Sequence, residues 1–164
     1  MNIKLNQLDS SLKKFIAVYI IVIIIGLTIG LIYLSQTTSI TPKGTIERFS
    51  GSEINESEFE IVDSYPKPIS EMLITTHNHI LGLSFIFFSI GILFYFNTII
   101  KGFWKIFLMI DPLVSLLITF GSIWLVRYID TQFIYITFLS SIVMYLSFYI
   151  MSFVIIFDLI LKKK

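Results

Sequence analysis

The chain has 164 residues, of which 55% are hydrophobic and only 14% are charged. A soluble domain of this length needs more charged residues to cover its surface, so the composition excludes an ordinary soluble protein. The formal net charge is +1, with lysines beside some apolar segments and carboxylates gathered between two others. Cysteine is absent, which excludes disulfides, zinc–thiolate sites, iron–sulfur clusters and cysteine nucleophiles within the chain. The composition therefore indicates an integral membrane protein.

Four apolar segments are long enough to cross a bilayer as helices, because about 20 residues at a rise of about 1.5 Å match a hydrocarbon core about 30 Å thick. We expect an all-α membrane protein, a four-helix transmembrane antiparallel bundle that forms a single membrane domain. The predicted helices cover residues of about 15–34, 72–100, 103–126 and 133–157. The first segment is longer than the apolar part of a signal peptide and no cleavage site follows it, so we expect an uncleaved anchor.

Lysines flank the predicted helices on one side of the membrane. They are Lys4, Lys13, Lys14, Lys101, Lys105 and the last three residues of the chain. Because positive charge in short flanking segments resists translocation, both termini are predicted to be cytoplasmic. Residues 36–70 then form an acidic extracytoplasmic loop, followed by a helix start with Ser70 as the expected N-cap. In a bacterium this topology predicts a multi-pass protein of the inner, cytoplasmic membrane with a periplasmic loop.

Small and polar residues in each predicted helix fall on one stripe, which in a membrane usually marks the face that packs on a neighbour. The stripes are Tyr19, Gly26, Gly30 and Tyr33; Glu71, Thr75, His79, Gly82 and Ser89; Asp111, Ser115 and Ser122; and Thr137, Ser140, Ser141, Met144, Ser147 and Met151. For the G-x-x-x-G pair we favour packing within the chain over a homodimer. The predicted interior of the bundle carries hydroxyls, one histidine and one carboxylate.

The only two histidines, His77 and His79, lie near the outer end of the second predicted helix. Residues two apart point about 200° from each other, so the pair cannot chelate one ion from one helical face. One hypothesis is haem b on His79, with Met144 as second ligand, a haem shared with another subunit or single-histidine ligation all open. Another is a single metal ion on His77 or His79 with Glu71 or loop carboxylates. Without a cofactor, the histidines would hydrogen-bond the helix start and a neighbouring loop.

Asp111 is a carboxylate inside the third predicted helix, about 12 Å from its cytoplasmic end. A carboxylate at this depth is costly, which makes Asp111 a candidate for proton handling, together with Asp158 and His79. Two structural alternatives remain open. Asp111 could satisfy carbonyls freed by Pro112, or it could pair with Lys105.

Four short motifs carry a resemblance to known proteins. They are Pro42-Lys43-Gly44, Arg48-Phe49-Ser50-Gly51, Thr76-His77-Asn78-His79 and Trp124-Leu125-Val126-Arg127-Tyr128. Together they resemble small bacterial four-helix inner-membrane proteins of unassigned function. The resemblance implies a shared topology and focuses attention on Thr76, His77, His79 and Arg127, but it implies no activity. An anionic group such as a haem propionate could lie between the two histidines and Arg127.

The usual signatures of soluble enzymes are missing from the sequence. It contains no P-loop, no dinucleotide-binding glycine pattern, no G-x-S-x-G, no H-E-x-x-H and no basic face for nucleic acid. No catalytic residue is assigned. We expect a non-enzymatic subunit that binds haem or a metal near the periplasmic face and serves an electron-transfer or respiratory assembly, in contact with lipid and other membrane-protein subunits. The alternatives are a cofactor-free structural or assembly subunit and a small proton or ion transporter.

Overall fold

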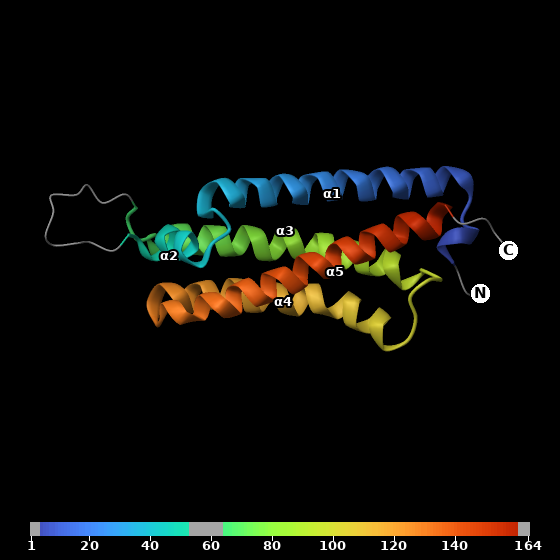
Figure 1. Cartoon of the computed structure of the whole chain (residues 1–164). Helices are drawn as coiled ribbons and strands as arrows, with labels where there is room; N and C mark the ends of the chain where they lie inside the picture. The colour runs from blue at the N-terminus through green and yellow to red at the C-terminus, as the bar shows by residue number, and fades with distance from the viewer. Residues whose placement is uncertain (1–3, 53–63, 161–164) are drawn as a thin grey trace, which may run out of the picture.

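The computed structural model describes residues 4–52 and 64–160, and every regular element in these ranges is helical. Four long helices run alternately in opposite directions (Figure 1): α1 (Ser10–Thr38), α3 (Ile69–Tyr95), α4 (Phe103–Tyr128) and α5 (Ile134–Ile160). Each is long and apolar enough to cross a membrane. The predicted all-α bundle with four spans is confirmed.

Shorter elements close the two ends of the bundle. α2 (Pro42–Ser50) lies at one end, which we call the α2 end, and the start of α1 and the finish of α5 lie at the other, the terminal end (Figure 1). A 3-10 turn, Leu5–Gln7, packs beside α5 at the terminal end, and a second, Thr131–Phe133, leads into α5 at the α2 end. The first and the last described parts of the chain therefore lie on the same side of the bundle. Their assignment to the cytoplasm stays a prediction.

Local hydrogen bonds explain where two of the long helices begin or end. α1 begins at Ser10, earlier than expected, because the Asp9 carboxylate accepts hydrogen bonds from the first backbone N–H groups of the helix. α3 ends at Tyr95 because the Asn97 side chain accepts hydrogen bonds from the backbone nitrogens of Ile99 and Ile100, at 3.0 and 2.8 Å, and so forms a turn.

The start of α3 corrects one expectation. Its N-cap is Pro68, in extended conformation and without a side-chain cap, whereas Ser70 lies inside the first turn. The prediction of Ser70 as the N-cap was therefore wrong. Since the ring of Pro68 fixes its φ near the helical value and has no N–H group to leave unpaired, the helix can begin directly after it.

The segment predicted as a loop, residues 36–70, contains the helix α2. Pro42 occupies its first turn and the Thr41 hydroxyl caps it by accepting a hydrogen bond from the backbone N–H of Gly44 at 3.1 Å. α2 buries Thr45 and Phe49 against the bundle and leaves its charged residues outside. Residues 53–63, the acidic part of this segment, lie outside the described residues.

The largest fully buried side chains of the core are phenylalanines, and the helices share the core unequally. α4 and α5 form the most extensive pair, α3 packs on both, and α1 packs mainly on α5 and α2. Phe87, Phe94 and Phe148 are fully buried, with the rings of Phe87 on α3 and Phe148 on α5 centred 6.2 Å apart. The remaining apolar surface of the four helices faces outward, where lipid solvates it.

The predicted stripes are confirmed on two helices and wrong on two. The small and polar stripes of α4 and α5 are buried at Ser115, Ser122, Thr137, Ser140, Met144, Ser147 and Met151. On α1, Gly26 and Gly30 are exposed, and a Cβ placed on either would meet no atom of the described chain outside their own helix within 4 Å. On α3, none of the predicted stripe is buried, and the core face consists of Met72, Phe87, Ile90, Gly91 and Phe94. Ser89 satisfies its hydroxyl on the Phe85 carbonyl of its own helix and so needs no partner on another helix.

Candidate functional site

Three consecutive polar residues, His77, Asn78 and His79, occupy the third turn of α3 and are all exposed. Counting about 20 residues back from Tyr95 at the terminal end places the far boundary of a hydrocarbon core about 30 Å thick near Thr75. The polar turn therefore lies at the level where hydrocarbon gives way to lipid headgroups. Trp124 and Tyr128, near the end of α4, stack on each other near this level, as expected of interfacial aromatic residues.

One ring nitrogen of His79, Nδ1, forms a hydrogen bond within α3, and the other, Nε2, does not take part in it. Nδ1 lies 2.8 Å from the Thr75 carbonyl oxygen, and the imidazole centre is 5.1 Å from the ring centre of Phe120 on α4. Because a carbonyl only accepts, Nδ1 carries the proton and Nε2 of the neutral ring keeps its lone pair. Histidines that bind metals usually donate their second ring N–H to such a carbonyl or to a carboxylate. The geometry of His79 therefore suits ligation through Nε2.

Thr76, which precedes the polar turn, forms a side-chain hydrogen bond with α4. The Trp124 indole N–H donates to the Thr76 hydroxyl at 2.9 Å. His77 points to the opposite side of α3 from His79 and is exposed. The T-H-x-H motif drew attention to Thr76, but no feature of the sequence indicated that its partner is Trp124.

The other residues proposed for a cofactor make contacts of their own. The Arg127 guanidinium donates to the Lys67 carbonyl at 3.4 Å and lies over the Tyr128 ring. Glu71 pairs with the Lys67 ammonium at 3.2 Å. Met144 is 2% exposed in the core, whereas His79 lies outside it. The structure thus brings none of Arg127, Glu71 or Met144 into a described hydrogen bond or ion pair with a histidine.

The described residues supply few ligands for a metal ion. In the ranges 4–52 and 64–160, no group of three or more histidines, cysteines, aspartates or glutamates could hold an ion. Protein-bound zinc takes three or four such ligands, so an ion at His79 would need most of its ligands from elsewhere. Haem iron takes four nitrogens from its own macrocycle and needs only an axial ligand from the protein. His79 can supply one such ligand.

A ladder of polar side chains joins α4 and α5 inside the bundle. We call the following residues the hydroxyl ladder: Asp111, Ser115, Thr119, Ser122, Thr137, Ser140 and Ser147. Its hydroxyl pairs are Ser122 with Thr137 at 2.7 Å and Thr119 with Ser140 at 2.8 Å. Deeper toward the terminal end, the Asp111 carboxylate accepts hydrogen bonds from Ser115 at 2.9 Å and Ser147 at 2.6 Å.

The hydrogen bonds of Asp111 and Asp158 show what each carboxylate does in the bundle, and those of Asp111 match neither alternative given for it. The Lys105 ammonium donates to the Asn97 carbonyl at 3.3 Å, so the predicted pair between Lys105 and Asp111 was wrong. Two serine hydroxyls satisfy Asp111 instead. Asp158 is fully buried and accepts hydrogen bonds from the Thr98 backbone N–H at 2.8 Å and hydroxyl at 2.6 Å. Asp158 therefore fastens the connection between α3 and α4 onto α5.

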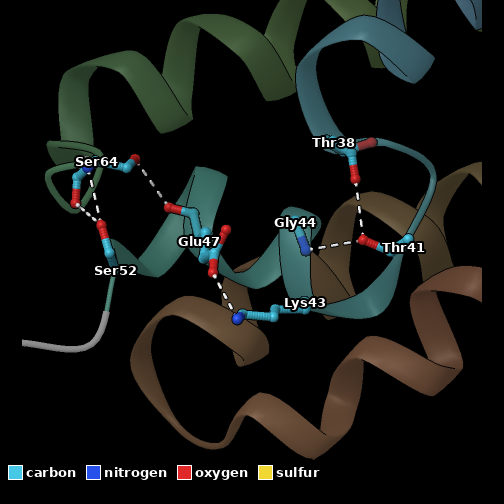
Figure 2. A network of polar contacts seen from close by, with 7 residues as sticks. All are labelled: Thr38, Thr41, Lys43, Gly44, Glu47, Ser52 and Ser64. Carbon is cyan, nitrogen blue, oxygen red and sulfur yellow. Dashed lines mark hydrogen bonds and ion pairs between the residues drawn. The ribbon is translucent and has the colours of Figure 1, made fainter.

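A second polar region lies at the α2 end. A cavity of about 620 Å³, which we call the α2 cavity, is bordered by the end of α1, by α2 and by the segment that leads into α3. Figure 2 shows how its walls are held: the Thr41 hydroxyl bonds the Thr38 carbonyl and the Gly44 N–H, and Ser52 bonds Ser64. Arg48 and Lys67 both line the α2 cavity.

The comparisons with known proteins agree with this architecture. Residues 39–164 match a family described as a transmembrane helical domain, and α1 precedes the matched part. No curated protein and no solved structure matches the chain. The resemblance to small membrane proteins of unassigned function is consistent with this match. Since the match covers more than half of the chain, the protein belongs to the transmembrane helical domain family, an uncharacterised family of helical membrane proteins.

Proposed function

We propose that this protein is a non-enzymatic subunit of a bacterial inner membrane that binds haem b at His79, near the extracytoplasmic face, and serves an electron-transfer assembly. The observation that supports the proposal is the hydrogen bond from Nδ1 of His79 to the Thr75 carbonyl, at 2.8 Å. It holds the ring in the tautomer that leaves Nε2 free to ligate iron. When bound, haem supplies reversible one-electron chemistry.

The position of His79 implies how the rest of such a site is completed. His79 is exposed on the bundle surface beside Phe120, whereas Met144 lies in the core, so Met144 is left out of the proposed ligand set. His79 would then be the one iron ligand from this chain, and any second ligand would come from a neighbouring subunit. Arg127, at the α2 end of α4, is a cation available to the propionates. A partner would also cover the polar turn of α3 from lipid.

The decisive measurement is an optical spectrum with metal analysis of the purified, full-length protein. We expect a Soret band in the reduced-minus-oxidised spectrum that His79→Ala abolishes. Asn78→Ala is the matched control, because Asn78 is the adjacent exposed polar residue and lies on the far side of α3 from the core. Circular dichroism shows whether each variant keeps its helices. A colourless, metal-free protein that co-purifies with other subunits would reject the proposal and favour the cofactor-free assembly subunit.

The hydroxyl ladder favours a second candidate function, the passage of protons or small ions. It places one carboxylate and several hydroxyls in a row between α4 and α5, and chains of such groups mark proton pathways in membrane proteins. If the protein works this way, liposomes that contain it lose an imposed pH gradient faster than empty liposomes, and Asp111→Asn stops this flux. Ser89→Ala, which removes a hydroxyl outside the ladder, should leave the flux unchanged.

A further inference from the structure

Two carboxylates and two cations line the α2 cavity. Each carboxylate has a cation close by: Glu47 pairs with Lys43 at 3.7 Å, and Glu71 pairs with Lys67 at 3.2 Å. Arg48 also lines the cavity and forms no ion pair with any carboxylate in the part of the chain that the structure describes. Within these residues, Arg48 is the one lining cation without a carboxylate partner.

Tyr33 fixes the position of this charge. One terminal nitrogen of Arg48 donates to the Tyr33 hydroxyl at 3.3 Å, and the guanidinium carbon lies 5.3 Å from the centre of the Tyr33 ring. A guanidinium has five N–H donors in one plane, so this bond leaves most of them unused. The remaining fork matches two oxygens of a phosphate or carboxylate. An arginine already held in place loses less conformational entropy when it binds such a group.

The α2 cavity offers further groups of suitable chemistry beside Arg48. Lys67 lies within its walls, with its ammonium 6.0 Å from the centre of the Phe49 ring, and Gln36 and Ser39 add an amide and a hydroxyl. The cavity borders the end of α1 and the start of α3, just beyond the hydrocarbon boundary near Thr75. This is the level of lipid phosphates. A polar cavity at this depth, with an arginine that no described carboxylate holds, suits a phosphate group.

We propose that the α2 cavity binds a phosphate-bearing anion, with Arg48 as its principal ligand and Lys67 as a supporting cation. The phosphate comes either from the headgroup of an anionic phospholipid or from a free phosphate compound in the surrounding water. This site is separate from His79, and its existence does not depend on a haem.

The test uses the full-length protein in neutral detergent and has two arms. In the first, native mass spectrometry counts phosphatidylglycerol retained by the protein in competition with phosphatidylcholine. In the second, calorimetry measures the binding of inorganic phosphate. In whichever arm detects binding, we expect Arg48→Gln to weaken it roughly tenfold, because the substitution removes a charge-assisted hydrogen bond to the phosphate. Lys101→Gln is the control, since Lys101 carries the same charge but is exposed between α3 and α4, at the terminal end.

The outcomes separate the two sources and can overturn the proposal. Binding in the lipid arm alone that Arg48→Gln weakens and Lys101→Gln preserves assigns a headgroup, and the same pattern with inorganic phosphate assigns a free compound. No binding in either arm, or equal weakening by both variants, overturns the site. If Arg48→Gln does not fold, Arg48→Lys decides, because it keeps the charge but loses the planar fork: weaker binding supports the proposal and unchanged binding rejects it. Neither result bears on the haem proposal, which the optical spectrum and His79→Ala test separately.

Discussion

α1 and the pair formed by α4 and α5 are all apolar enough to span a membrane, yet the structure uses them differently. Among the residues of the most apolar stretch, 17% are buried in α1 and 44% in the span that contains α5. The hydroxyl ladder joins α4 to α5, whereas a single side-chain hydrogen bond among the described residues, between Thr28 and Tyr149 at 2.8 Å, joins α1 to α5. Lipid solvates apolar side chains as well as a neighbouring helix does, so apolarity alone gives no preference for packing. Close pairing follows the polar groups and the shape of the core.

The largest effect that would test this comparison is expected in the core of α5. Phe148→Ala should lower the free energy of unfolding by about 3 to 5 kcal/mol, because it leaves a cavity where the ring packs on Phe87. Phe153→Ala on the same helix removes a ring that is half exposed and should cost much less. Reversible unfolding in mixed micelles measures both. Equal losses in the two variants would show that the core does not hold α5 more firmly than lipid does.

The next largest effect is expected where α1 turns into α2. A Cβ on Gly44 would collide with the backbone carbonyl of Thr38, so Gly44→Ala should cost about 1 to 3 kcal/mol and loosen α2. Gly26→Ala is the matched change in an open position of α1 and should alter stability by less than about 0.5 kcal/mol. Unfolding and limited proteolysis near residue 44 compare the two. A large loss in Gly26→Ala would reveal a partner on the exposed face of α1.

A smaller effect is expected within the hydroxyl ladder. A double-mutant cycle of Thr119→Val and Ser140→Ala should give a coupling energy of about 1 kcal/mol, since both hydroxyls are buried and bond each other. The control pair is Thr119→Val with Ser141→Ala, whose hydroxyl bonds its own helix. Zero coupling in the first cycle would mean that the ladder does not stabilise the pairing of α4 with α5.

The smallest effect is expected at the tie between α1 and α5. The cycle of Thr28→Val with Tyr149→Phe should give about 0.6 kcal/mol or less, because the bond is only partly buried and the Thr28 hydroxyl, which donates to the Ile24 carbonyl, can only accept from Tyr149. The same unfolding assay provides the value. A coupling larger than that of Thr119 with Ser140 would contradict the view of α1 as the loosely held helix.

The sequence predicts the spans well because an apolar run of about 20 residues with so few charges rarely forms anything but a helix that crosses a membrane. It predicts the inner faces of α4 and α5 because serines and threonines with helical spacing on both helices need partners, and each stripe supplies the other. Glycines give no such constraint: Gly26 and Gly30 permit close approach without requiring it, so their exposure on α1 could not be foreseen.

The candidate site was predictable only in part. Two histidines in an apolar helix identify the polar turn of α3, but the carbonyl that fixes the tautomer of His79 and the indole that bonds Thr76 depend on side-chain orientations. Arg48 belongs to a short motif to which the sequence assigns no role, because its bond to Tyr33 and its lack of an ion pair among the described residues appear only in the folded chain. The arrangement of charges in the α2 cavity is a property of the fold rather than of any local pattern.

The bond between Thr28 and Tyr149 also bears on how the protein is made. The two residues are 121 positions apart, so α1 enters the membrane long before its partner on α5 has been synthesised. During that time α1 has no α5 to pack against. A helix with so few polar groups on its surface tolerates this delay, whereas the hydroxyls of α4 wait only for the next helix of the chain. The order of synthesis thus matches the order in which each helix comes to need a neighbour.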